Sequence, residues 1–161
     1  MRIFVTLLFM AFLSQAQLCA QEVYNLVLAN ATRTVNSPTA SYTQTQIAQF
    51  KRTALIYMKS KAFEVSETVS SEFLDTQAYF MSEFITLFFN EFVKIKKLPD
   101  AERKERILSF MEISITHPLF HDPDEETTLS FIKDGGEITP FSLDTNWKEA
   151  FEAAEQMVKA Q

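Results

Sequence analysis

The segment 73–97 constrains the fold most, because it is apolar around roughly half of a helix. Its apolar residues recur at alternating spacings of four and three and form one helical seam: Leu74, Ala78, Met81, Ile85, Phe88, Phe92 and Ile95. Other apolar residues widen this seam on both sides: Phe73, Phe80, Phe84, Leu87 and Phe89. A stripe this wide needs several covering neighbours. The segment therefore predicts the central helix of a helical bundle.

Two other interpretations of this segment have different consequences. A membrane span would place Glu83, Asn90 and Glu91 in lipid, where a carboxylate costs several kcal/mol, so we expect no transmembrane span in the mature chain. The aromatic face can instead line a pocket for an apolar ligand or a groove for a partner helix, which makes an apolar-ligand carrier an alternative function. Aromatic stripes at helical spacing are more often core, and we prefer that interpretation.

Residues 1–20 have the organisation of a cleaved export signal. Arg2 supplies the positive start, residues 3–13 an apolar run, and residues 14–20 a short polar-to-small end. Cleavage after Ala20 leaves residues 21–161 as a single helical domain. The chain is therefore expected to be exported, either periplasmic or secreted. Cys19 raises the alternative of a lipoprotein anchor, but Leu18 is bulky where lipoprotein signals carry a small residue.

Composition narrows the possible functions further. Cys19 is the only cysteine, so a chain cleaved after Ala20 has no disulfide, no cysteine metal ligand and no thiol nucleophile. Its stability must come from a hydrophobic core, and the full sequence, 47% hydrophobic with 16 Phe, provides the material for one. The formal net charge is −6, with six basic against fourteen acidic residues over 99–161. This acidic half argues against nucleic acid and anionic membrane surfaces as partners.

Two helices are expected before the central one. The first covers 22–35 and ends at the Asn-Ser-Pro sequence 36–38, with an apolar side of Val23, Leu26, Val27 and Ala31. The second begins at Ser41 or Thr43, because each is followed three residues later by Gln, as in a capping box. Its buried face is expected to be Ile47, Phe50, Ala54, Tyr57, Met58, Ala62 and Val65. Segment 66–71 is rich in capping residues and predicts a turn before the central helix.

The region after Pro99 changes its periodicity once. A helix begins at Asp100, with Asp100–Lys104 and Glu102–Arg106 as charge pairs, and ends at His117 and Pro118. Its inward side is expected to be Ile107, Leu108, Phe110, Met111, Ser114 and Ile115.

Segments 128–132 and 137–141 predict two short strands joined by a tight turn of Asp134, Gly135 and Gly136, with Pro140 on an edge. Asp144 or Thr145 then caps a final helix with one apolar face: Trp147, Ala150, Phe151, Ala154, Met157 and Val158. The predicted fold class is mainly α: a bundle of about five helices around a Phe-rich central helix, with a small β-hairpin before the C-terminal helix.

The segment 117–126 is the densest cluster of chemically reactive side chains. Its candidate ligands for zinc or calcium are His117, His121, Asp122, Asp124 and Glu126. As a calcium loop starting at Asp122 the segment fails, because Thr127 replaces the required Gly and Lys133 the bidentate Glu. The alternative is an acidic loop, stiffened by proline, in which Asp122 or Asp124 caps a turn.

No catalytic or cofactor-binding residue is assigned, because the chain has no nucleophile elbow, Walker loop, dinucleotide fingerprint or His-Glu-x-x-His motif. Glu83 and Glu91 lie about 80° apart around the central helix, which does not favour an acid/base pair, and we expect Glu91 to pair with Lys94. The primary functional hypothesis is an exported, non-enzymatic interaction or structural module of the cell envelope with an unknown protein partner. The alternatives are the apolar-ligand carrier and a metal-binding protein or hydrolase acting through 117–126.

Overall fold

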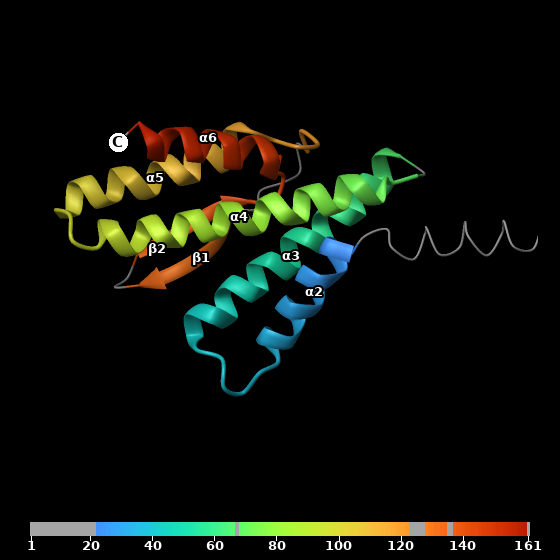
Figure 1. Ribbon diagram of the computed structural model, residues 1–161, viewed down its shortest axis with the longest axis horizontal. Coiled ribbons are helices and arrows are strands. Elements are labelled where there is room, and N and C mark those ends of the chain that lie inside the picture. Colours follow the sequence, from blue (N-terminus) through green and yellow to red (C-terminus); the bar gives the residue numbers. More distant parts are fainter. Residues whose placement is uncertain (1–21, 67, 123–127, 135–136, 161) are drawn as a thin grey trace, which may run out of the picture.

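The computed structural model describes residues 22–66, 68–122, 128–134 and 137–160. For residues 128–134 and 137–140 it describes the backbone only. Its elements in chain order are α2 (Glu22–Val35), α3 (Tyr42–Val65), α4 (Ser71–Ile95), α5 (Asp100–Thr116), β1 (Thr128–Asp134), β2 (Glu137–Ser142) and α6 (Trp147–Lys159). The predicted fold class is confirmed: within these ranges the protein is mainly helical, with five helices and a small hairpin before the last one (Figure 1).

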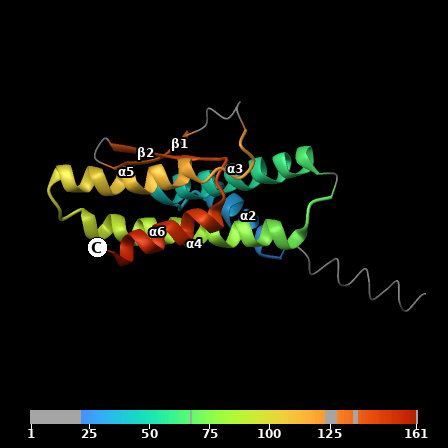
Figure 2. The ribbon, with the colours of Figure 1, turned by 90° about the horizontal axis from the view of Figure 1, so that it is seen from above.

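Helix α4 is the centre of the bundle, as its apolar seam predicts. It contacts each of the other described helices, α2, α3, α5 and α6. Figure 2 shows α4 and α6 on one side of the molecule, α3 and α5 in the middle, and the hairpin on the opposite side. In that hairpin β1 lies against α3 and β2 against α5. None of the described helices is long and apolar enough to cross a membrane.

The rings of α4 pack against rings from three other elements: α5, β2 and α6. The Phe84 ring meets those of Phe110, Phe141 and Trp147 nearly edge-on, with centroids 5.8, 5.5 and 5.6 Å away. Phe50 of α3 packs in the same way on Phe141 and Trp147. Each such pair adds about 0.5–1.5 kcal/mol beyond the burial of its apolar surface. Protein side chains therefore cover these rings, which favours the core interpretation over a ligand pocket lined by them.

Local capping fixes the boundaries of α3 and α4. Ser41 starts α3 through a complete capping box: its hydroxyl accepts from the Gln44 backbone N–H at 3.3 Å, and Gln44 Oε1 accepts from the Ser41 N–H at 2.8 Å. Helix α3 ends at Val65, and Ser70 caps α4 by accepting from the Phe73 N–H. The predicted turn is thus confirmed, and the two helices are separate. The predicted pair of Glu91 with Lys94 also forms.

The α6 cap differs from the prediction. Asn146, rather than Asp144 or Thr145, is the N-cap residue, and its Oδ1 accepts from the Glu149 N–H at 3.5 Å. The same Oδ1 accepts from Nε2 of the buried Gln77 of α4 at 3.0 Å, while Gln77 Oε1 accepts from the Trp147 N–H at 2.8 Å. The start of α6 is therefore held by α4 as well as by its own cap.

Charge pairing in α5 also differs from the prediction. Asp100 pairs with Arg103, three residues on, at 3.0 Å instead of with Lys104. The predicted Glu102–Arg106 pair does not form within the described part of the chain. Both spacings place the partners on neighbouring turns of the helix, so the local sequence alone does not select between them.

Several apolar residues that were expected to be buried are exposed. Leu26, Val65, Leu108 and Ile115 all face solvent. Neighbours cover one side of α5 only, where Ile107, Phe110 and Ser114 are buried. Leu108 and Ile115 lie seven residues apart on the opposite side, so the apolar stripe of α5 is wider than the surface that its neighbours cover.

The strands β1 and β2 pair antiparallel from Thr128 opposite Ser142 to Asp134 opposite Glu137, with an irregularity between Ser130 and Lys133. Both strands extend past the predicted bounds. The predicted turn residues Gly135 and Gly136 lie outside the described residues, as does the export signal predicted for 1–20.

Candidate functional site

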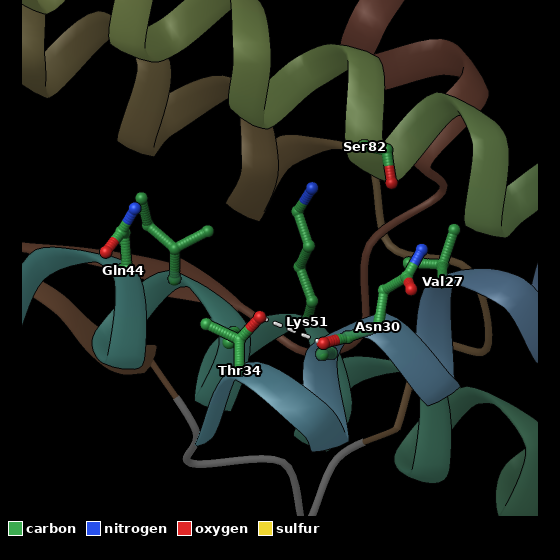
Figure 3. Close-up of a pocket in the computed structure, with 9 residues that line it drawn as sticks. Val27, Asn30, Thr34, Gln44, Lys51 and Ser82 are labelled. Atoms are coloured by element: carbon green, nitrogen blue, oxygen red, sulfur yellow. Dashed lines mark hydrogen bonds between the residues drawn. The ribbon is translucent and has the colours of Figure 1, made fainter. Parts of the chain in front are cut away.

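A pocket of about 400 Å³ lies where the α2–α3 hairpin meets α4 (Figure 3). Its lining comes from three helices: Val27, Asn30, Ala31 and Thr34 of α2, Gln44, Ile47, Ala48 and Lys51 of α3, and Ser82 of α4. The volume falls within the range of sites for small organic molecules. One part of the lining is apolar, and the rest can form hydrogen bonds.

Small side chains make room for this pocket. Ala31 of α2 and Ala48 of α3 are both buried, and both line the pocket. Because alanine side chains end at Cβ, the walls recede at these positions. Lys51 follows Ala48 by three residues, so it projects from the same face of α3. In Figure 3 its ammonium extends away from α3 in the direction of α4.

Lys51 is a partly buried cation without a close partner. Within the described part of the chain it makes no hydrogen bond and no ion pair. Burial lowers the pKa of the Lys51 ammonium below its ordinary value, while the negative charge of Glu83 on α4 acts in the opposite direction. A dehydrated ammonium is stabilised by any anion that replaces its lost hydration. The electrostatics therefore favour a negatively charged ligand group at Lys51.

Ser82 provides a second unsatisfied group beside the pocket. Its hydroxyl and the Trp147 indole N–H are buried and lack partners among the described residues. The rings of Phe50 and Phe84 pack on the indole, whereas Ser82 lines the pocket. The Ser82 hydroxyl oxygen is buried, and a hydroxyl of this kind can both donate and accept a hydrogen bond.

A second hollow of about 300 Å³ adjoins the pocket at the α2–α3 turn. The two share Thr34 and Gln44, and the second is lined further by Arg33, Ser37, Thr39 and Ala40. Arg33 is exposed and adds a second positive charge along the same groove. The hairpin thus offers a continuous surface with a cation near each end.

The predicted metal ligands have different partners in the structure. His117 ends α5, with Nδ1 3.5 Å from Glu149 Oε2, and His121 is exposed with a positive φ of 54°. Asp122 Oδ2 accepts from Lys61 Nζ at 2.8 Å and from the Tyr57 hydroxyl at 3.3 Å. The other two candidates, Asp124 and Glu126, lie outside the described residues. No group of three His, Cys, Asp or Glu suited to a metal ion occurs in the described ranges. The zinc or calcium site therefore stays a prediction.

Asp144 explains the path of the loop that follows α5. Its buried carboxylate accepts three backbone N–H groups, from Leu119 at 3.0 Å and Phe120 at 2.7 Å on Oδ1 and from Asp122 at 2.9 Å on Oδ2. Three N–H groups that converge on one anion form a backbone nest. His121, with its positive φ, lies within this turn. The loop therefore wraps around a carboxylate of the protein itself.

The pocket was not predicted from the sequence, although two residues of its lining occupy unusual positions. Lys51 lies four residues after Ile47 and four before Leu55, so it falls inside the apolar stripe of α3. Ser82 lies four residues after Ala78 and three before Ile85, at a seam position of α4. A charged or hydroxyl side chain at such a position either has a buried partner or faces a cavity.

Comparison with known proteins gave no family model that matches this chain, and no match among curated proteins or solved structures.

Proposed function

We propose that this protein is an exported, non-enzymatic binding module whose pocket between α2, α3 and α4 takes a small organic anion with an apolar portion. The observation that carries this proposal is the partly buried Lys51 ammonium, which has no hydrogen bond or ion pair within the described part of the chain. The export component rests on the signal-like pattern of residues 1–20.

A monocarboxylate suits the pocket best. Its charged end would accept hydrogen bonds from Lys51 Nζ and from the Ser82 hydroxyl, and such charge-assisted bonds contribute about 1.5–3 kcal/mol. Its apolar end lies against Val27 and Ile47. Glu83 carries the same sign as the ligand and partly offsets the charge of Lys51, which disfavours a ligand with two negative charges.

This proposal makes the chain a carrier or sensor of a small molecule through the α2–α3 hairpin rather than through the aromatic face of α4. The pocket also adds a ligand class, a small organic anion, to the hypothesis of an interaction module. A protein partner in the envelope would then recognise the ligand-bound module, whose folded state the ligand stabilises.

The test is binding of hexanoate compared with hexanol, which has the same apolar chain without the charge. Thermal unfolding and calorimetry are measured on the wild type, on Lys51→Met and on Lys97→Met, where Lys97 is an exposed lysine beyond α4. A ligand that binds only the folded state raises Tm. We expect hexanoate to raise the Tm of the wild type and of Lys97→Met, and to have at least tenfold weaker affinity for Lys51→Met.

Two further measurements sharpen the result. Ser82→Ala is expected to weaken hexanoate several-fold and to leave hexanol unchanged. Hexanoate affinity is expected to fall as pH rises through the lowered pKa of Lys51, since the neutral amine no longer attracts the carboxylate. Equal binding of hexanoate by wild type and Lys51→Met, or no binding by either, would overturn the proposal.

A further inference from the structure

Two helices of this protein carry exposed apolar residues in matching positions. On α3, Ile56 and Phe63 are 53% and 50% exposed, and on α5, Leu108 and Ile115 are 47% and 46% exposed. Each pair is seven residues apart, so each lies along one line on the outside of its helix. Each helix therefore exposes apolar side chains on two turns of the same side, whereas exposed apolar residues that are scattered singly need no explanation.

Charged residues of opposite sign accompany these two lines. We define the α3 stripe as Arg52, Ile56, Lys59 and Phe63, and the α5 stripe as Glu105, Leu108, Glu112 and Ile115. The basic and acidic residues of both stripes make no ion pair within the described residues. Lys59 Nζ lies 5.3 Å from the centre of the Tyr24 ring, a contact that leaves its N–H groups able to donate.

The order of residue types is the same in both stripes: charged, apolar, charged, apolar. Their spacings are four, three, four on α3 and three, four, three on α5. Side by side in parallel, the stripes place Arg52 by Glu105, Lys59 by Glu112, and the two apolar pairs against each other. Each stripe extends about 16 Å at a rise of 1.5 Å per residue.

The positions around each helix select the parallel orientation. At about 100° per residue, Arg52 and Lys59 lie about 40° and 60° to one side of Ile56. Glu105 and Glu112 lie about 60° and 40° to the opposite side of Leu108. In a parallel helix pair these two sides face each other. An antiparallel pair would instead bring the basic side of α3 against the exposed Lys104 of α5.

We propose that the α3 stripe of one copy of this protein packs in parallel against the α5 stripe of a second copy. Pairing of two α3 stripes would oppose like positive charges, and pairing of two α5 stripes would oppose like negative charges, so only the mixed pair is complementary. Figures 1 and 2 show α3 and α5 towards opposite ends of the long axis, so the two stripes of one molecule do not meet.

This contact uses two different surfaces and is heterologous, so it builds open chains of copies or a closed ring. Three turns of helix on each side are fewer than a standard interface contains, and we expect a dissociation constant of about 10–100 μM. Because the ion pairs lie at the surface, salt is expected to weaken the association.

The test is sedimentation of the full chain with two charge-reversed variants. The first carries Arg52→Glu with Lys59→Glu, and the second Glu105→Lys with Glu112→Lys. Wild type is expected to associate with increasing concentration, and each variant alone to associate at least tenfold more weakly. An equimolar mixture of the two variants is expected to regain wild-type affinity, because each supplies what the other lacks. A chain with all four reversals is expected to associate by itself.

Net charge does not account for such a rescue. The formal charge of −6 changes by −4 to −10 in the first variant and by +4 to −2 in the second, so both remain negative. Unchanged melting temperatures confirm that each variant is folded. The proposal is overturned if the wild type stays monomeric up to about 1 mM, if neither variant weakens association, or if the mixture does not restore it.

Discussion

Lys51 and Lys61 are the same residue type on the same helix, ten residues apart, and their surroundings are opposite. Lys61 Nζ lies 2.8 Å from Asp122 Oδ2 and 3.0 Å from Glu64 Oε2. Hydrogen bonds, first to Asp122 and then to Glu64, raise the pKa of Lys61, whereas burial lowers the pKa of Lys51. The comparison teaches that partners, rather than position on a helix, separate a lysine that stabilises the fold from one suited to bind a ligand.

The surroundings of each lysine extend this contrast. Around Lys61 the charges are matched: Asp122 also accepts from Tyr57, and its backbone N–H donates to Asp144. Around Lys51 neither the ammonium nor the Ser82 hydroxyl has a hydrogen-bond partner in the described part of the protein. The first region therefore ties α3 to the loop after α5, while the second contains polar groups without hydrogen-bond partners among the described residues.

The largest expected effect tests the region of paired charges around Lys61, Asp122 and Asp144. Asp144→Ala removes the acceptor of three backbone N–H groups, and each donor left unpaired in a buried site costs about 1–3 kcal/mol. We expect the free energy of unfolding to fall by about 3–5 kcal/mol, measured by urea denaturation. Asp144→Asn keeps one acceptor oxygen and is expected to lose less. A loss below about 1 kcal/mol for Asp144→Ala would show that the nest is dispensable.

The second effect concerns the lysine of that region. Lys61→Met is expected to lower Tm, though by less than Asp144→Ala, because Asp122 loses its ammonium partner and keeps the Tyr57 hydroxyl. Lys97→Met is the control and is expected to leave Tm unchanged. If the two substitutions have the same effect, the Asp122 contact contributes nothing to stability.

The third effect has the opposite sign. Without ligand, Lys51→Met is expected to raise the free energy of unfolding by up to about 1 kcal/mol, since it removes a cation whose burial the charge of Glu83 offsets only in part. The same substitution is expected to weaken hexanoate binding at least tenfold. If Lys51→Met is more stable than the wild type and binds hexanoate more weakly, the two lysines have opposite roles. If Lys51→Met is less stable, Lys51 supports the fold as Lys61 does.

The smallest effect is the pH dependence of these differences. For Lys51 the folded-state pKa is lowered, so the unfolded chain binds more protons and the stability of the wild type rises as pH increases through that pKa. The advantage of Lys51→Met is therefore expected to shrink at alkaline pH. For Lys61 the folded-state pKa is raised, so its contribution is complete below the unfolded-state pKa of about 10.4 and is lost gradually as pH rises from there through the raised pKa. Tyr24, whose phenol pKa burial also raises, contributes equally to all variants and cancels.

Local signals predicted much of this fold. The alternation of four and three along α4 requires a covered face, and α4 contacts all the other described helices. The capping box at Ser41 and the cap at Ser70 act within three residues, so the sequence contains everything they need. The bounds of α2 and α5 could therefore be predicted within a residue, whereas two capping boxes competed for the start of α3 and the one at Ser41 forms.

Contacts between distant residues could not be predicted in this way. Asp144 resembles a helix cap in the sequence, but it binds N–H groups more than twenty residues earlier. Leu108 and Ile115 continue an apolar pattern, and only the placement of α4 and β2 shows that they face outward. The pocket at Lys51 needs Ala31 on another helix to be small. In each case the deciding partner is far away in the chain.

Asp144 and Trp147 come later in the sequence than the loop and the rings that they contact, and this order determines when those contacts can form during synthesis. A nascent chain that ends at residue 143 contains α2 to α5, yet the loop around residue 120 has no carboxylate to enclose and Phe50 and Phe84 lack the Trp147 ring. At about 5–20 residues per second, the last 18 residues take roughly one to four seconds to add. We expect ribosome-bound chains ending at residue 143 to be cleaved rapidly by protease and full chains on a linker to resist it. Folding of this domain is therefore expected to wait until Asp144 and Trp147 have been added and can reach their partners.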